Sequence, residues 1–191
     1  MNSEENILEH FKKMSALLEG HFILSSGLHS PKYLQCALAL QSPKEATNFG
    51  RAIAEKLDRE QFDTIASPAI GGLIIGYEVA RASNTRFIWT ERENGIMTLR
   101  RGFSVKENEK ILVIEDVITT GGSTRECIGA LESHGAKVTG AASIIDRSNG
   151  RADVGVKRFA LASLEVPSYK TEDCPMCAKG EIAVKPGSRA N

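Results

Sequence analysis

Ile111-Leu-Val-Ile-Glu-Asp-Val-Ile-Thr-Thr-Gly-Gly-Ser-Thr124 is the stretch of sequence that decides the fold. It begins as an apolar run of the kind that forms a buried parallel strand. The run ends in two adjacent carboxylates, Glu115 and Asp116, and a Thr/Gly loop follows. Ser123 and Glu126 have the spacing of a capping box and predict that a helix begins there. A strand that passes through a loop into a helix is the repeating unit of α/β sheets.

The loop from Thr119 to Ser123 predicts a phosphate site. At a helix N-terminus several backbone N–H groups point toward one place and favour an anion there. Glu115 and Asp116 do not suit the phosphate itself, but carboxylates suit hydroxyl groups or a metal beside it. A ligand with a phosphate at one end and a diol next to it is a ribose 5-phosphate. We therefore expect this loop to bind one.

Strands and helices alternate along most of the chain, which predicts a right-handed, doubly wound α/β sheet. Ligands of such sheets bind at the carboxyl ends of the strands, where Pro68–Gly72, Glu115–Ser123 and Asp146–Arg147 are all expected. Short strands and loops are expected over 22–40. The expected helices cover 3–18, 71–82 and 123–134 and a segment that begins at 42, and the expected strands cover 63–67, 86–90, 111–115, 138–145 and 156–164.

The composition indicates a soluble chain. There are 24 Lys and Arg and 24 Asp and Glu among 191 residues, so the formal net charge is zero. This balance disfavours bulk electrostatic binding to nucleic acid or to an anionic membrane. No apolar run reaches the ~18 residues needed to span a bilayer, and the N-terminus lacks the pattern of a signal peptide. We expect a cytoplasmic protein without a nucleic-acid or membrane partner.

Two common classes of nucleotide-binding protein are disfavoured. A Walker A loop requires Gly-x4-Gly-Lys-Ser/Thr, and the segment Thr119–Thr124 contains no lysine. A Rossmann G-x-G-x-x-G after a first strand is also missing; Gly71-Gly72 with Gly76 only approximates it. Hydrolysis of nucleotide triphosphates and binding of NAD are therefore not expected.

The strand, the acid pair and the Thr/Gly loop together resemble the signature of the type I phosphoribosyltransferases, which bind 5-phosphoribosyl pyrophosphate (PRPP). The resemblance implies a single domain over 1–191, with a doubly wound core of about 41–165, a small N-terminal hood of about 1–40 and a C-terminal tail. It implies that the acid pair binds the ribose 2- and 3-hydroxyls and that the loop wraps the 5-phosphate. The implied PRPP-binding residues are Glu115, Asp116, Val117, Ile118, Thr119, Thr120, Gly121, Gly122, Ser123, Gly71 and Gly72.

Three further segments resemble the orotate phosphoribosyltransferases within that family. Gly20–Gly27 with Ser30–Tyr33 resembles their hood, Asp146–Arg147 their orotate-contacting pair, and Cys174–Arg189 the C-terminal end of one bacterial and archaeal branch. Arg147 makes chemical sense, because a guanidinium binds the carboxylate of orotate bidentately and a purine offers no such anion. The implied orotate-binding residues are Thr119, Arg147 and Tyr33.

The chain departs from better-known members of this family by losing lysines. Ser25 stands where they carry Lys in the hood, and Ile70-Gly71-Gly72 stands where they have Tyr-Lys-Gly. Their mobile loop contains several lysines, whereas the corresponding stretch here is Glu91–Arg101. Its arginines are the candidates to neutralise pyrophosphate during catalysis, with a solvated hairpin face as the alternative. These candidate catalytic residues are Arg92, Arg100 and Arg101.

The resemblance implies a Mg²⁺-dependent glycosyltransferase that transfers ribose 5-phosphate from PRPP to orotate, in the pathway that makes UMP. Mg²⁺ is expected to be held mainly by PRPP and water, without a firm protein ligand. A homodimer is implied, in which the loop of one subunit closes on the neighbouring site. A purine phosphoribosyltransferase is the alternative enzyme. A PRPP-sensing regulator is the alternative from another class, disfavoured by the neutral charge and by the lack of a helix-turn-helix segment before residue 60.

Four cysteines and four histidines remain to be interpreted. Cys174 and Cys177 have zinc-like CxxC spacing, but one CxxC supplies only two of four ligands. We interpret them as two thiols of a mobile tail, with a zinc site completed by another subunit or by a histidine as the alternative. The histidines show no spacing such as HExxH, and we expect no catalytic role for any of them: His10, His21, His29 and His134.

Overall fold

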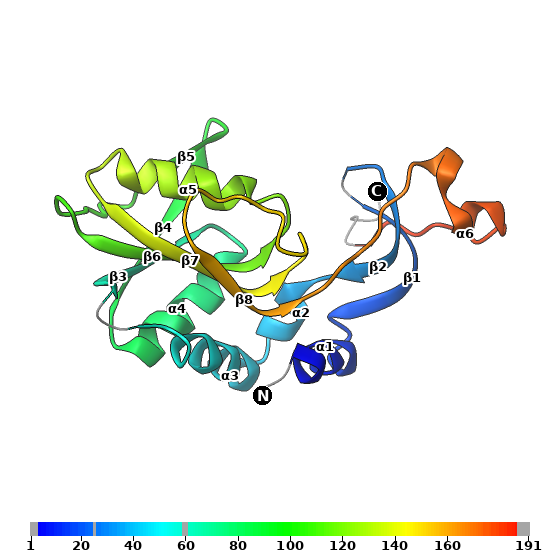
Figure 1. Ribbon diagram of the computed structural model, residues 1–191, viewed down its shortest axis with the longest axis horizontal. Coiled ribbons are helices and arrows are strands. Elements are labelled where there is room, and N and C mark those ends of the chain that lie inside the picture. The colour runs from blue at the N-terminus through cyan, green and yellow to red at the C-terminus, as the bar shows by residue number, and fades with distance from the viewer. Residues whose placement is uncertain (1–3, 25, 59–60, 187–191) are drawn as a thin grey trace.

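The computed structural model describes residues 4–24, 26–58 and 61–186, and its central element is a six-stranded sheet (Figure 1). The strands are β3 (Thr64–Pro68), β4 (Arg86–Glu93), β5 (Ile96–Leu99), β6 (Lys110–Ile118), β7 (Lys137–Asp146) and β8 (Arg158–Ser163). Their order is β5-β4-β3-β6-β7-β8. Neighbouring strands are parallel except β4 and β5, which form an antiparallel hairpin. The prediction of a mainly parallel sheet is confirmed.

Helices cover both faces of this sheet. Helices α3 (Pro43–Ala54) and α4 (Gly72–Ser83) lie on one face, and α5 (Gly122–Glu132) lies on the other (Figure 1). The side chains of β6 alternate between the two layers, as those of a strand must. Leu112 and Ile114 belong to the core under α3 and α4, whereas Ile111 and Val113 belong to the core under α5. Because both faces are buried, β6 has the continuous apolar sequence that predicted it.

The chain order creates a switch point between β3 and β6. From β3 the chain passes through α4 to β4 on one side, and from β6 it passes through α5 to β7 on the other side. The loops that leave the two adjacent strands therefore diverge, and a crevice forms outside their carboxyl ends. The predicted doubly wound fold is thus confirmed, and it places Pro68–Gly72 opposite Glu115–Ser123.

A smaller unit lies beside the sheet, and we call it the hood. It consists of α1 (Glu4–Lys13), the antiparallel hairpin of β1 (Leu17–Ile23) and β2 (His29–Leu34), and α2 (Cys36–Leu40). The C-terminal tail runs back from β8 along this hairpin and carries a 3₁₀ turn, Thr171–Asp173, and α6 (Pro175–Ala178) (Figure 1). Residues of α1, α2 and the sheet share one hydrophobic cluster, so hood and core pack as a continuous interior.

The prediction of one helix over 3–18 is wrong at its end. Helix α1 stops at Lys13, and Ser15 takes a left-handed φ of 54°. The Ala16 N–H then donates to the Phe11 carbonyl, which closes the helix. Leu17 is buried as the first residue of β1 rather than as a helical residue. Its helical spacing of three residues from Met14 is a coincidence of the pattern.

The predicted capping box at the start of α5 is also wrong. The helix begins at Gly122, and its N-cap residue is Gly121, without a side-chain capping bond. Ser123 therefore lies inside the first turn, and Glu126 forms an ion pair with Arg92 instead. The short helix α2 was not predicted either, because five residues carry too little of a 3.6-residue period to be recognised.

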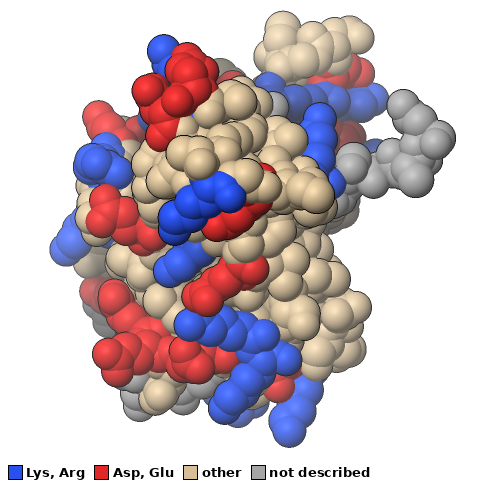
Figure 2. All heavy atoms as spheres, turned by 90° about the vertical axis from the view of Figure 1, so that its right-hand side faces the viewer, with Lys and Arg blue, Asp and Glu red and all other residues tan. Residues whose placement is uncertain are grey.

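The surface agrees with the balanced composition. On the face that carries the hood and tail, acidic and basic side chains are interspersed (Figure 2). Among the described residues, none of the helices combines the length and hydropathy that crossing a bilayer requires.

Candidate functional site

The Thr/Gly loop forms a polar depression at the carboxyl end of β6. Its volume is about 210 Å³, and it is lined by consecutive residues from Glu115 to Thr124. Gly121 has a left-handed φ of 76°, and an added Cβ would lie 2.7 Å from the Val154 side chain. The turn therefore requires glycine there. The first backbone N–H groups of α5 have no partner within the helix and point out of its N-terminus.

The loop after β3 packs directly against the acid pair. An added Cβ on Gly71 would lie 2.9 Å from Oδ1 of Asp116. On Gly72 it would lie 2.8 Å from the Ile114 carbonyl oxygen and 3.3 Å from Oε1 of Glu115. The structure thus brings together the two predicted segments, and it leaves no room for side chains between them. Backbone N–H groups can then approach a ligand held by the carboxylates.

Glu115 and Asp116 form a pair of adjacent carboxyl groups, of which Glu115 is buried and Asp116 half-buried. Only 7% of the Glu115 surface is exposed, and burial together with the nearby Asp116 charge raises the pKa of Glu115. Burial also raises the pKa of Asp116, although its Oδ1 accepts a 2.8 Å hydrogen bond from the Val117 N–H. Two such groups favour sharing a proton until hydroxyl donors or a cation stabilise both charges.

The same donor set fits Mg²⁺. Carboxylate oxygens are ligands that Mg²⁺ accepts, and Glu115 and Asp116 are the carboxylates in the lining of the loop depression. The remaining lining consists of backbone, small hydroxyl side chains and aliphatic side chains, which favours an ion that keeps most of its water and substrate ligands.

Arg147 lies beside the loop with an unsatisfied guanidinium nitrogen. Its Nε is buried, and no hydrogen-bond partner for it occurs in the described parts of the chain. Burial lowers the pKa of Arg147, while the neighbouring Cys36 and Tyr33 oppose the shift. A buried donor without a partner is unfavourable unless a ligand supplies an acceptor. Arg147 is therefore suited to bind an anion.

Arg147 opens onto a cavity that adjoins the phosphate loop. This cavity has a volume of about 540 Å³ and shares Thr119 and Thr120 with the loop depression. Two arginines that were not predicted also line it. Arg125 donates to the Thr120 carbonyl at 3.1 Å, and Arg151 donates to the Ser148 carbonyl at 3.0 Å. Arg151 could have been predicted to line this cavity, because it follows Arg147 by four residues in the same loop.

Asp146 holds the loop that presents Arg147. Its Oδ1 accepts hydrogen bonds from the Ser148 N–H and hydroxyl, at 2.7 and 2.6 Å. Its Oδ2 accepts from the Gly150 N–H and from Nη1 of Arg158, both at 2.9 Å. Burial raises the pKa of Asp146, but these bonds outweigh it and lower the pKa overall. The carboxylate thus faces its own loop, and Arg147 is the member of the predicted pair that faces the cavity.

The hairpin arginines are ion-paired in this structure. Arg92 pairs with Glu126 of α5 and donates to the Gly95 carbonyl. Arg100 and Arg101 both pair with Glu91, at 3.4 and 3.0 Å. The hairpin therefore presents paired rather than unpaired cations, which matches the alternative of a solvated face in this conformation.

Tyr33 lies on β2 of the hood. Its ring centroid lies 5.9 Å from that of Phe22, and its hydroxyl accepts a 3.4 Å hydrogen bond from Gln35. Tyr33 is close enough to Arg147 to influence its pKa. Ser25, which stands where better-known members of the resembled family carry a lysine in the hood, lies outside the described residues.

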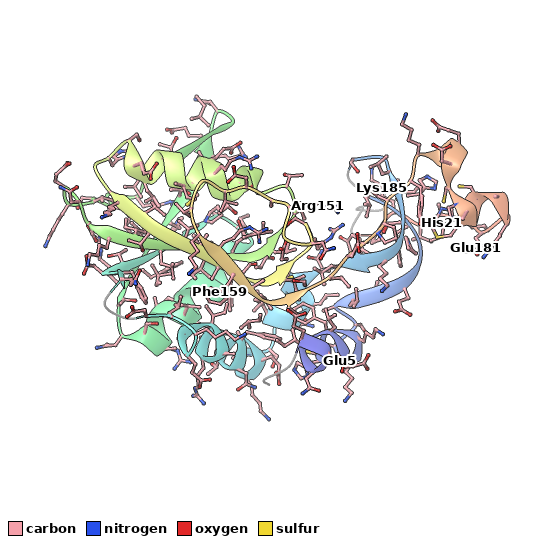
Figure 3. The ribbon with its side chains drawn as sticks, in the orientation of Figure 1. Glu5, His21, Arg151, Phe159, Glu181 and Lys185 are labelled. Atoms are coloured by element: carbon pink, nitrogen blue, oxygen red, sulfur yellow. The ribbon has the colours of Figure 1, made fainter. Side chains whose placement is uncertain are left out.

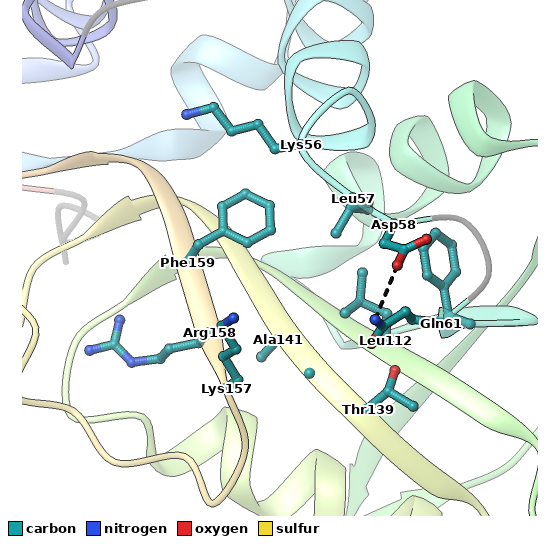
Figure 4. Close-up of a pocket in the computed structure, with 12 residues that line it drawn as sticks. Lys56, Leu57, Asp58, Gln61, Leu112, Thr139, Ala141, Lys157, Arg158 and Phe159 are labelled. Carbon is teal, nitrogen blue, oxygen red and sulfur yellow. Dashed lines mark hydrogen bonds between the residues drawn. The ribbon is translucent and has the colours of Figure 1, made fainter.

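A further cavity lies at the opposite edge of the sheet (Figure 4). Its volume is about 230 Å³, and the amino-terminal ends of β6, β7 and β8 form its floor. A hydrogen bond of 3.1 Å joins Gln61 to Asp58 at its rim. Since ligands of doubly wound sheets bind at the carboxyl ends, we do not include this cavity in the candidate site.

Residues 39–163 match the family model described as phosphoribosyl transferase domain. The orotate phosphoribosyltransferase of Pelotomaculum thermopropionicum is 50% identical over 187 residues, which cover 98% of both chains. That of Thermotoga maritima is 50% identical over 183 residues, 96% of this chain and 98% of the relative. The crystal structure of orotate phosphoribosyltransferase from Aeropyrum pernix has a TM-score of 0.67 at 25% identity, covering 83% of this chain and 93% of that one.

Proposed function

Because the chain belongs to the phosphoribosyltransferase family, we propose that it transfers ribose 5-phosphate from PRPP to orotate. The products are orotidine 5-monophosphate and pyrophosphate, and the reaction is a pentosyl transfer of pyrimidine biosynthesis. The single observation that carries the choice of base is the buried, unpartnered Nε of Arg147 beside Thr119. Orotate has a carboxylate to satisfy this guanidinium, whereas a purine base has none.

Binding of PRPP begins with its phosphate and its ribose. The 5-phosphate accepts hydrogen bonds from the loop and from the N-terminus of α5, where the helix dipole adds about 0.3–1 kcal/mol for one charge. The ribose 2- and 3-hydroxyls donate to Glu115 and Asp116. Hydroxyl donors favour the ionised carboxylates, so the ligand removes the proton that the free pair shares.

Orotate then binds on the Arg147 side of the shared Thr119 and Thr120. Arg147 holds its carboxylate, and Tyr33 of the hood, which is near enough to influence the pKa of Arg147, is the candidate to cover the ring. This arrangement orients N1 of orotate toward the anomeric carbon of the ribose. Orienting the two reactants in this way removes much of the entropic part of the barrier.

In the chemical step N1 of orotate forms a bond to C1 of the ribose as the bond from C1 to pyrophosphate breaks, and the proton of N1 passes to the departing pyrophosphate or to solvent. Positive charge develops on the ribose ring and negative charge on the leaving pyrophosphate. The Gly71 and Gly72 backbone N–H groups lie next to the acid pair and can donate to pyrophosphate. Mg²⁺, when bound, neutralises the pyrophosphate oxygens as a Lewis acid. For Arg92, Arg100 and Arg101 to add their charge, the hairpin must release its present ion pairs.

We also propose a homodimer, with one hairpin closing on the neighbouring site. Support comes from a row of exposed apolar side chains at and before the start of α4. Ile70, Ile74 and Tyr77 are 84%, 48% and 57% exposed. Ile74 and Tyr77 are three residues apart on one face of α4, and Ile70 lies four residues before Ile74, just ahead of the helix. Apolar side chains that gather on one exposed face are typical of interfaces. The free cysteines fit a cytoplasmic location.

A substrate panel tests this function. Purified protein with PRPP and Mg²⁺ is assayed for pyrophosphate release with orotate, adenine, hypoxanthine, guanine and xanthine. We expect release with orotate alone. Release with a purine would favour the purine enzyme, and tight binding of PRPP without release from any base would favour a regulator.

A further inference from the structure

A cluster of metal-ligating side chains lies between the hood and the tail, away from the PRPP loop. His21 of β1, His29 of β2 and the two cysteines of the CxxC, Cys174 and Cys177, each offer one ligand atom, and these atoms lie within 4.8 Å of one another. We propose that the four side chains bind one Zn²⁺ ion. The interpretation of Cys174 and Cys177 as two thiols of a mobile tail is therefore replaced by its alternative, in which histidines complete the site.

The distances fit a tetrahedral ion. Zn–S bonds of about 2.3 Å and Zn–N bonds of about 2.0–2.1 Å place neighbouring ligand atoms about 3.3–3.8 Å apart. The Cys174 sulfur lies 3.5 Å from Nε2 of His21, and the Cys177 sulfur lies 3.3 Å from Nδ1 of His29 and 3.7 Å from Nε2 of His21. The two histidine nitrogens are 2.7 Å apart. This distance must open by about 0.6 Å to reach the tetrahedral edge. The two remaining pairs, Cys174 with Cys177 and Cys174 with His29, lie within 4.8 Å, so the ion would draw the ligand atoms of the longer pair closer together.

Each histidine has a partner for its other ring nitrogen. Nδ1 of His21 lies 2.9 Å from the Glu181 carbonyl oxygen, and Nε2 of His29 lies 3.4 Å from the Thr171 hydroxyl. A carbonyl oxygen accepts only, so Nδ1 of His21 carries the proton and Nε2 presents its lone pair to the cluster. Such outer hydrogen bonds orient metal-binding imidazoles in proteins. Figure 3 shows Glu181 next to His21, at the end of the molecule that carries the C-terminal tail.

The donor set selects zinc over hard cations. Two thiols and two imidazoles form the cluster, without a carboxylate, whereas Mg²⁺ and Ca²⁺ require oxygen ligands. His21, His29 and Cys174 are buried, with exposed fractions of 5%, 7% and 2%. Four protein ligands close the tetrahedron, so the ion has no open position for substrate or water. The site is structural rather than catalytic.

The ion would fasten the tail to both strands of the hood hairpin. Backbone hydrogen bonds already flank the cluster on each side. The Ile23 N–H donates to the Val184 carbonyl at 2.8 Å, and His29 and Tyr169 exchange a pair of 2.8 Å bonds. A metal between these two contacts joins β1, β2 and the tail into one rigid unit. Because Tyr33 lies on β2, the ion also stabilises the strand that carries this proposed orotate-binding residue.

Metal analysis of the full-length, tag-free protein tests the proposal without reference to activity. We expect about one zinc per chain by mass spectrometry, since a site with four ligands in place holds structural zinc tightly. After removal of zinc by a chelator, added Co²⁺ should give the intense visible bands of tetrahedral Co²⁺ together with thiolate charge-transfer absorption. Chelation should also speed proteolysis of the tail.

Matched variants assign the ligands. Cys177→Ser and His29→Gln should lose stoichiometric zinc, whereas Cys127→Ala and His134→Gln, which change the same residue types outside the cluster, should keep it. If the ligand variants do not fold, the wild-type Co²⁺ spectrum remains decisive. Absence of zinc from protein made in zinc-supplemented medium, a weak octahedral Co²⁺ spectrum, or a Cys174–Cys177 disulfide in the native protein would each overturn the proposal. None of these readouts depends on the orotate reaction.

Discussion

Gly71 faces the carboxylate of Asp116 so closely that an added Cβ would lie 2.9 Å from Oδ1. This contact joins the loop after β3 to the acid pair at the end of β6, across the switch point of the sheet. Any side chain on Gly71 must displace either the loop or the carboxylate. The position of the Asp116 carboxylate therefore depends on a glycine that is distant in sequence.

Gly71→Ala should weaken PRPP binding because the new methyl group moves the Asp116 carboxylate. We expect the KM for PRPP to rise by about tenfold or more, since one charge-assisted hydrogen bond is worth about 1.5–3 kcal/mol. The KM for orotate should change little. Gly129→Ala is the control, because a Cβ there meets nothing within 4 Å. Equal KM values for PRPP in both variants would show that the contact is unimportant.

Arg147→Ala should weaken orotate binding selectively. Loss of a bidentate guanidinium–carboxylate contact is expected to raise the KM for orotate by about 10–100-fold. Binding of PRPP, measured by calorimetry in the absence of orotate, should remain near the wild-type value. Arg81→Ala provides the matched control, since Arg81 pairs with Glu78 on the surface of α4. An unchanged KM for orotate in Arg147→Ala would remove Arg147 from the base site.

Glu115→Gln should stabilise the free protein while it abolishes efficient PRPP binding. Burial and the Asp116 charge raise the pKa of Glu115 from 4.5 to about 9. Because this pKa is raised in the folded state, the protonated Glu115 costs the wild-type protein no stability at a pH below the unfolded pKa. The free energy of unfolding then falls as the pH rises from the unfolded pKa through the folded pKa. The Tm of the wild-type protein should therefore fall further and further below the Tm of Glu115→Gln as the pH rises from about 5 to about 9.

The control for this comparison is Glu132→Gln, which changes an exposed glutamate of α5. Its Tm difference from the wild type should stay constant over the same pH range. A constant difference for Glu115→Gln as well would mean that the free acid pair carries no shared proton. Saturating PRPP should reverse the order of stability, because only the wild-type pair binds the ribose hydroxyls well.

The core of this fold could be predicted because its local signals agree with one another. The residues of β6 are apolar on both faces, α3 begins with Ser42-Pro43, and Asn94-Gly95 supplies the left-handed turn of the hairpin. The end of α1 could not be predicted, since Leu17 fits the helical spacing as well as the strand. The false capping box has a similar cause: Gly121 provides the turn, so Ser123 is not needed as a cap.

The functional residues also divide into those that could be predicted from the sequence and those that could not. The loop from Thr119 to Ser123 and the acid pair before it are one continuous segment, so the polar depression that they line could be predicted from residue order. The zinc cluster could not, because His21 and His29 meet through the register of a hairpin, and Cys174 reaches them from the far end of the chain. Spacing along the sequence reports only ligands on one element. The ion-pair partners of Arg92 and Arg100 could not be predicted either, since ion pairs depend on where side chains lie in the folded chain.

Subunit mixing tests the proposed dimer and the role of its hairpin together. If Arg100 of one subunit acts in the neighbouring site, Arg100→Ala and Arg147→Ala damage different parts of each composite site. A mixed dimer then contains one doubly damaged site and one intact site. Random mixing of equal amounts should restore about one quarter of the wild-type activity, because half of the dimers are mixed and each has one working site.

The interface itself is tested by Ile74→Glu, which places a charge in the exposed apolar row on α4. By light scattering the variant should be a monomer of 20.7 kDa, and it should fail to complement in the mixing experiment. Ile182→Glu is the control, because Ile182 is 87% exposed on the tail, away from α4. A wild-type protein that is monomeric at assay concentrations, or mixtures that stay inactive although mixed dimers form, would contradict a shared site. The hairpin arginines would then act, if at all, within their own subunit.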